Sequence, residues 1–118
     1  MALVLGLDQT AVTIASGTSL TAAVPLGAKT LVGIAMPASG WDAAGLSFQV
    51  SADGGTTWLE MFSSSAVIGY TAAAGSYIAI DPALWRGINL IKVRSGTTGS
   101  AVTQTADRIL TLITRPMV

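Results

Sequence analysis

The chain contains no cysteine and no histidine among its 118 residues. Without cysteine it has no disulfides, no thiolate metal ligands and no cysteine nucleophile, so its core alone must hold the fold. Without histidine it also lacks the commonest general base and the commonest zinc ligand. The sequence therefore predicts a protein that is not an enzyme, with no catalytic residues, no cofactor and no metal.

Charge is the next shortage. Charged residues make up 10% of the chain, against about 25% in an ordinary soluble domain. Six basic residues balance six acidic ones, and binding to nucleic acid or to an acidic membrane surface needs clustered lysine and arginine instead. Because 51% of the residues are hydrophobic, two interpretations remain. Either partners in an assembly cover the surface, copies of the same chain included, or serine, threonine and glycine solvate a monomer.

The apolar start of the chain does not predict a targeting signal. Met1 to Leu7 (MALVLGL) has no basic residue and meets Asp8 at once, whereas a signal peptide needs a charged start and a longer apolar run. A second uncharged stretch, between Glu60 and Asp81, is interrupted by serines and glycines and is too polar for a spanning helix. We expect no membrane association. We also expect residues 1–118 to form one domain, with 1–18 as an N-terminal arm or edge strand.

The clearest structural pattern is a hairpin around residues 46–62. Leu46, Phe48 and Val50 alternate with polar residues, which is the period of two of a half-buried strand. The next residues, Asp53-Gly54-Gly55-Thr56, suit a tight turn because glycine accepts positive φ. The run from Thr57 to Phe62 then predicts the second strand.

The rest of the chain also favours short strands. Seven to nine apolar or β-branched runs are separated by Gly, Ser, Thr and Pro, and no stretch keeps a helical period over three turns, which predicts an all-β antiparallel sandwich. One short helical turn is expected near 82–86, with Asp81 as its N-cap and Pro82 at its first position. Strand spacing alone leaves jelly-roll and immunoglobulin-like topologies open.

The turn in the hairpin has its own signature, Ser-x-Asp-x-Gly-x-Thr-Trp. It resembles the Asp-box, a hairpin motif that recurs in sialidases and other propeller proteins, where it is structural. We expect the Asp carboxylate to accept backbone N–H bonds, Gly to take positive φ and Trp to pack beneath the turn. A sugar- or ion-binding role for Asp53 is the alternative. The predicted structural-turn residues are Ser51, Asp53, Gly55 and Trp58.

Three longer stretches resemble small structural proteins of tailed-phage virions: SADGGTTWLEM, GSYIAIDPALWRGINLIKVRSGT and ADRILTLITRP, within roughly residues 46–115. The resemblance implies a capsid decoration (cement) protein with a jelly-roll-like fold, made in the bacterial cytoplasm and located on the capsid surface of the virion. Its partners would then be the major capsid protein and further copies of itself, as a homo-oligomer, held by many weak contacts. The candidate interface residues are Leu3, Leu5, Trp41, Trp85 and Arg86.

Two alternatives to capsid decoration stay open. One is a glycan-binding module of a phage head fibre, spike or tail, in which exposed Trp41 and Trp85 bind sugar, although a Trp in a loop beside a sandwich is more often part of the core. The other is a tail or baseplate adaptor.

Overall fold

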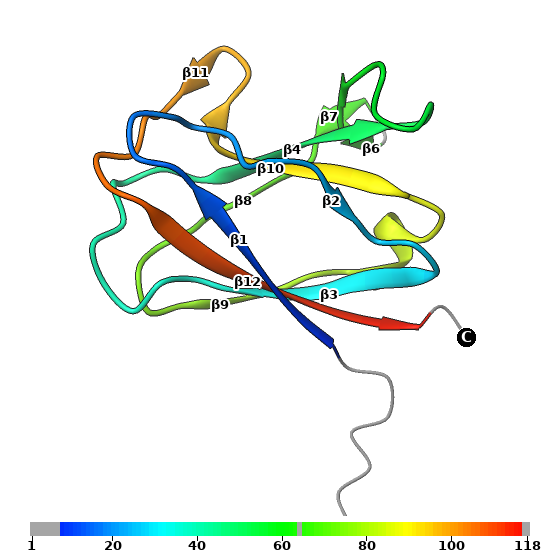
Figure 1. Ribbon diagram of the computed structural model, residues 1–118, viewed down its shortest axis with the longest axis horizontal. Coiled ribbons are helices and arrows are strands. Elements are labelled where there is room, and N and C mark those ends of the chain that lie inside the picture. The colour runs from blue at the N-terminus through cyan, green and yellow to red at the C-terminus, as the bar shows by residue number, and fades with distance from the viewer. Residues whose placement is uncertain (1–7, 64, 117–118) are drawn as a thin grey trace, which may run out of the picture.

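The computed structural model describes residues 8–63 and 65–116. Within them the elements are short strands and one turn of 3₁₀ helix, as expected (Figure 1). In chain order they are β1 (Asp8–Ile14), β2 (Val24–Pro25), β3 (Lys29–Ala35), β4 (Leu46–Ser51), β5 (Leu59–Glu60), β6 (Phe62–Ser63), β7 (Ala66–Val67), β8 (Gly69–Tyr70), β9 (Tyr77–Ala79), η1 (Pro82–Trp85), β10 (Leu90–Thr97), β11 (Ser100–Ala101) and β12 (Arg108–Pro116).

Two antiparallel sheets form the layers of a β-sandwich. One sheet has the order β1-β12-β3-β9, and the other has β10 and β4 at its centre (Figure 1). In the second sheet β2 lies beside β10, whereas β5 and β8 share the edge beside β4. When β5 and β8 are counted as one strand and the two-residue strands β6, β7 and β11 are left out, the orders are first-eighth-third-sixth and second-seventh-fourth-fifth. This is the strand order of a jelly roll. The predicted all-β sandwich is therefore confirmed, and its strand order differs from that of an immunoglobulin-like sandwich.

The core lies between the two layers and follows from the alternation along the strands. Leu46 and Phe48 of β4 are buried, as are Ile91 and Val93 of β10, while residues between them point the other way. At its centre the ring of Phe48 meets the indole of Trp85 edge-on, with 4.7 Å between ring centroids. Burial of side chains of this size supplies most of the free energy that stabilises a small domain without disulfides.

The local expectations were largely met, with two differences. Helix η1 begins after Asp81, whose Oδ1 accepts the Ala83 N–H at 3.1 Å. The second hairpin strand is shorter than predicted, because only Leu59 and Glu60 form β5 before Met61 turns its side chain into the core. Strand β2 is also only two residues long, and it ends at Pro25, which has no N–H with which to continue the ladder.

Candidate docking surface

The outward side of the four-stranded sheet is a continuous surface made by β1, β12, β3 and β9. Its outward positions follow from the burial pattern and the strand register, in which Ile109 of β12 lies opposite Thr13 of β1 and Tyr77 of β9 lies opposite Ala35 of β3. We call this surface the outer sheet face. It consists of Gln9, Ala11, Thr13, Gly33, Ala35, Tyr77, Ala79, Ile109, Thr111 and Ile113.

None of these ten residues is charged. Two large side chains stand out from the face, since Tyr77 is 59% and Ile109 56% exposed. Arg115, at the next outward position of β12, marks one end. Covering a surface of aromatic, β-branched and small side chains removes no charged group from water, so the cost of desolvation is small. Such a surface suits contact with another protein.

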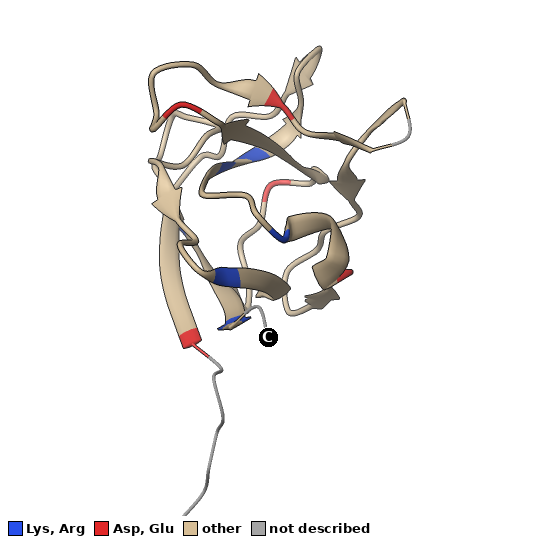
Figure 2. Ribbon diagram, turned by 90° about the vertical axis from the view of Figure 1, so that its right-hand side faces the viewer, with Lys and Arg blue, Asp and Glu red and all other residues tan. Residues whose placement is uncertain are grey.

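The other sheet presents a different surface. Lys92 and Arg94 of β10 point outward there, opposite Gln49 and Ser47 of β4. Arg94 is nevertheless buried, because Glu60 of β5 forms an ion pair with it and Ser47 Oγ accepts a bond from its Nε at 3.0 Å. Figure 2 shows that the basic and the acidic residues of the described part of the chain are both spread over the ribbon.

Each of the six carboxylates has a partner within the fold. Asp8 forms an ion pair with Lys29, Asp42 with Arg108 and Glu60 with Arg94. The other three accept backbone N–H groups, Asp53 from Thr57, Asp81 from Ala83 and Asp107 from Ser16. Each of these contacts contributes to holding the fold together.

Asp42 is the most heavily bonded carboxylate. Arg108 Nη2 donates to its Oδ1 at 2.8 Å and the Thr105 N–H donates to its Oδ2 at 2.9 Å. Partial burial acts to raise the pKa of Asp42, but the bonds from Arg108 and Thr105 and the positive charge of Arg108 outweigh it, so the pKa lies below its usual value. Buried Gln104 joins the same cluster through Arg108 Nε at 3.1 Å and the Asp42 N–H at 2.9 Å. The cluster holds two distant loops together.

The four predicted turn residues make one hydrogen-bonded unit. Ser51 Oγ accepts the Gly55 N–H and Asp53 Oδ1 accepts the Thr57 N–H, both at 2.8 Å. Gly55 has φ +100°, and Trp58 Nε1 donates to its carbonyl at 3.1 Å. Bonds from the Thr57 backbone and side chain, and from Ser51, lower the pKa of Asp53. All of these contacts lie inside the turn, and Lys92 covers the Trp58 ring at 4.5 Å from its centroid.

The candidate interface residues do not form one surface. Trp85 is wrong as an interface residue, because its side chain is fully buried against Phe48. Trp41 is half-buried and its Nε1 donates to the Ala44 carbonyl at 3.0 Å. Arg86 is exposed beside η1, whereas Leu3 and Leu5 lie outside the described residues. A sugar platform made of Trp41 and Trp85 is therefore not present.

The outer sheet face was missed from the sequence. Its signal was the outward alternation Ile109-Thr111-Ile113 in the last strand, combined with Ala11 and Thr13 in the first. Each run by itself looks like an ordinary half-buried strand. Only the pairing of β1 with β12 and β3 with β9 brings these uncharged residues onto one surface.

Over residues 8–63 and 65–116, no group of three acidic, histidine or cysteine side chains is placed to hold a metal ion. In the same ranges no helix has the length and apolar character needed to cross a membrane. Comparison with known proteins finds no matching family model, no matching curated protein and no matching solved structure.

Proposed function

We propose that this chain is a non-enzymatic structural protein of a tailed-phage virion, and that it decorates the capsid by docking its outer sheet face on the shell of major capsid protein. The observation that carries the proposal is the absence of charge from that face, where Tyr77 and Ile109 are more than half exposed. The resemblance over roughly residues 46–115 to small structural proteins of tailed-phage virions is the reason for proposing a phage capsid as the partner.

Two further features support the proposal. The jelly roll is common among viral capsid and lectin domains, which is an analogy at the level of fold. The carboxylates are engaged in ion pairs, turns and caps within the fold, which favours a structural role over a catalytic one. Uncharged contacts that are weak one by one would add up over the many symmetric copies on a shell.

The test uses shells assembled without this protein. Purified chain is mixed with the shells, and the bound fraction is measured by sedimentation at low and high salt. Because the docking face is uncharged, we expect binding to change little with ionic strength. Labelling intact virions with an antibody to the chain then locates it on the head or the tail.

The matched variants are Ile109→Lys and Leu59→Lys. The two residues are almost equally exposed, at 56% and 57%, but Leu59 lies on the other sheet. An unpaired lysine in the contact should weaken shell binding by about tenfold or more, so we expect Ile109→Lys to lose binding and Leu59→Lys to keep it. Equal effects of both variants would show that the outer sheet face is not the docking surface. Labelling of the tail would favour the adaptor, and binding to a glycan array without binding to shells would favour the glycan module.

A further inference from the structure

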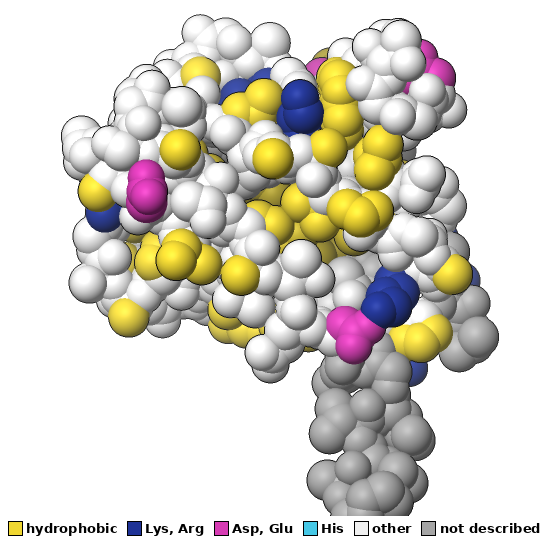
Figure 3. Space-filling view, viewed as in Figure 1, with side chains coloured by type: hydrophobic (Ala, Val, Ile, Leu, Met, Phe, Trp, Pro, Cys, Tyr) yellow, Lys and Arg dark blue, Asp and Glu magenta, His cyan; other side chains and the backbone are white. Residues whose placement is uncertain are grey.

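A groove runs along the open edge of the sandwich, between β1 of one sheet and the segment 21–28, which carries β2 of the other sheet. It consists of two hollows of about 220 Å³ and 370 Å³, which share Thr10, Val24 and Pro25 as lining residues. Both are far larger than the space of a single water molecule, about 30 Å³. Figure 3 shows hydrophobic side chains on the floor of this groove.

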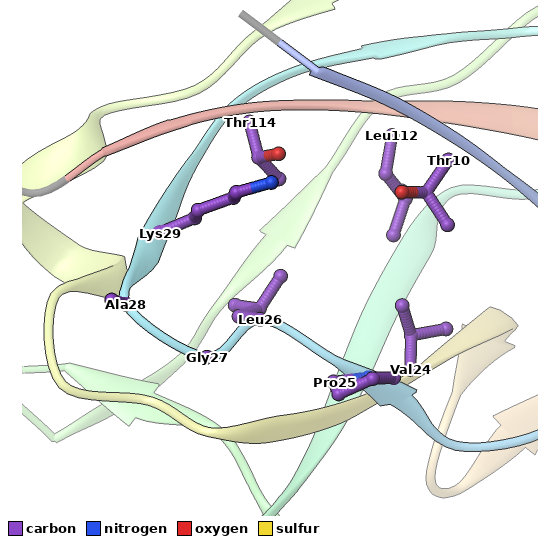
Figure 4. Close-up of a pocket in the computed structure, with 9 residues that line it drawn as sticks. All are labelled: Thr10, Val24, Pro25, Leu26, Gly27, Ala28, Lys29, Leu112 and Thr114. Atoms are coloured by element: carbon purple, nitrogen blue, oxygen red, sulfur yellow. The ribbon is translucent and has the colours of Figure 1, made fainter. Parts of the chain in front are cut away.

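The groove is apolar and opens onto the core. In the larger hollow every lining residue is uncharged. In the smaller one Thr10 and Leu112 lie across from Val24 and Leu26, with Lys29 at one end (Figure 4). Lys29 is already paired with Asp8. An occupant should therefore be an uncharged chain with aliphatic side chains.

The groove is also bordered by an unprotected strand edge. Among residues 8–63 and 65–116, β1 is the outermost strand of its sheet and pairs with β12 alone, so its other edge faces the groove. Natural edge strands are usually kept short or guarded by lysine or proline. β1 has seven residues, DQTAVTI, with neither lysine nor proline. Such an edge is suited to accept one more strand.

The sequence just before β1 has the matching pattern. Residues 1–7 are uncharged, and their odd positions are large (Met1, Leu3, Leu5, Leu7) while their even positions are small or branched (Ala2, Val4, Gly6). As a strand these seven residues would extend about 23 Å, the length of β1, with their large side chains on one side. The segment joins the fold at Asp8, the first residue of β1. Asp8 pairs with Lys29, which lines one end of the groove.

We propose that residues 1–7 of one copy add as an antiparallel strand to the free edge of β1 in a second copy and fill its groove. In the register where Leu5 lies opposite Thr10 and Leu3 opposite Val12, the leucines share the side of Val12, which points into the sandwich. Because residues 1–7 and β1 are equally long, the exchange is reciprocal and closes as a two-fold dimer. This inference does not rest on capsid binding, since self-association is measured without shells.

The first test is the oligomeric state of the full chain by sedimentation equilibrium. We expect a reversible dimer of twice 11.9 kDa. Leu5→Lys should raise the dissociation constant at least about tenfold, because it places a charge among aliphatic groups. The matched control Val4→Lys points to the opposite side and should leave the dimer intact. A monomer at all concentrations, or equal effects of the two variants, would overturn the proposal.

The second test uses the absence of cysteine in the chain. A Leu5→Cys chain is mixed with a Thr10→Cys chain and oxidised, so that a disulfide between the two different chains can form only across copies. We expect the mixed disulfide to dominate, and we expect a Val4→Cys chain mixed with Thr10→Cys to form little of it. In a single chain that carries both Leu5→Cys and Thr10→Cys, an internal disulfide in a monomer would show that the segment folds back on its own β1, which would overturn the exchange between copies.

Discussion

The phenol of Tyr77 lies directly over the backbone of Gly33, so that a Cβ atom on Gly33 would overlap the Tyr77 hydroxyl. The two residues belong to neighbouring strands, because Gly33 of β3 pairs with Ala79 of β9, two residues after Tyr77. An aromatic ring that covers a strand glycine shields the exposed backbone that glycine would otherwise leave. Gly33 thus fixes where the largest side chain of the outer sheet face lies.

The first prediction concerns this pair. Gly33→Ala should change the free energy of unfolding by less than about 1 kcal/mol, because the exposed Tyr77 can turn aside and alanine reduces the entropy lost by a strand glycine. It should nevertheless weaken shell binding, because the ring leaves its place on the outer sheet face. Denaturant unfolding and shell sedimentation measure the two effects. Tyr77→Ala is the comparison, and a Gly33→Ala variant that binds as well as the original would show that the ring position is unimportant.

The second prediction concerns the turn at residues 51–58. Gly55→Val should destabilise the fold by roughly 1–3 kcal/mol, because a β-branched residue is strained at φ +100°. Asp53→Ala should cost about 1–2 kcal/mol, since it leaves the Thr57 N–H without its acceptor. Thermal and urea unfolding test both.

Ala52→Ser, at an exposed position in the same turn, is the control and should be close to neutral. The structural interpretation of the turn would have to be abandoned if Asp53→Ala kept its full stability and lost a binding activity instead.

The third prediction concerns Trp85. Trp85→Ala should lower the free energy of unfolding by roughly 3–5 kcal/mol, because it opens a cavity beside Phe48. Trp85→Phe should cost clearly less. Its Nε1 is buried without a hydrogen-bond partner among the described residues, so phenylalanine sacrifices no hydrogen bond while it keeps an aromatic ring there. Equal losses in the two variants, measured in guanidinium, would contradict this account.

The sequence predicted those parts of the fold that depend on neighbouring residues. The turn from Ser51 to Trp58 and the Asp81 cap of η1 use contacts only a few residues apart, so their patterns were readable. For Trp85 the sequence left both the core and an interface open, because its burial depends on Phe48, which lies far away in sequence. Arg94 points away from the core as its alternation predicts, yet Glu60 from the edge strand β5 covers it.

The candidate site was harder to predict for the same physical reason. The outer sheet face depends on a register that joins Thr13 to Ile109, across almost the whole chain. Alternation within one strand says which residues share a side, but it does not say which strands lie next to each other. The shortage of charge could be read from composition, whereas its location required the sheet order.

The last prediction follows from the lowered pKa of Asp42 and of Asp53. An aspartate whose pKa is lower in the folded state contributes stability above its unfolded value, near 3.9, and this contribution is lost as the pH falls through the folded-state value. We therefore expect the free energy of unfolding to fall as the pH drops below about 4. Asp42→Asn should be less stable than the original chain at neutral pH but should lose less stability on acidification. In the described part of the chain Asp42 bonds to Thr105 and Arg108, whereas Asp53 bonds to Ser51 and Thr57. The double variant with Asp53→Asn should therefore reduce the loss of stability in acid further, by about the sum of the two single effects. Urea unfolding from pH 7 to pH 2 measures this, and an unchanged acid slope in both single variants would show that neither carboxylate stabilises the fold through its charge.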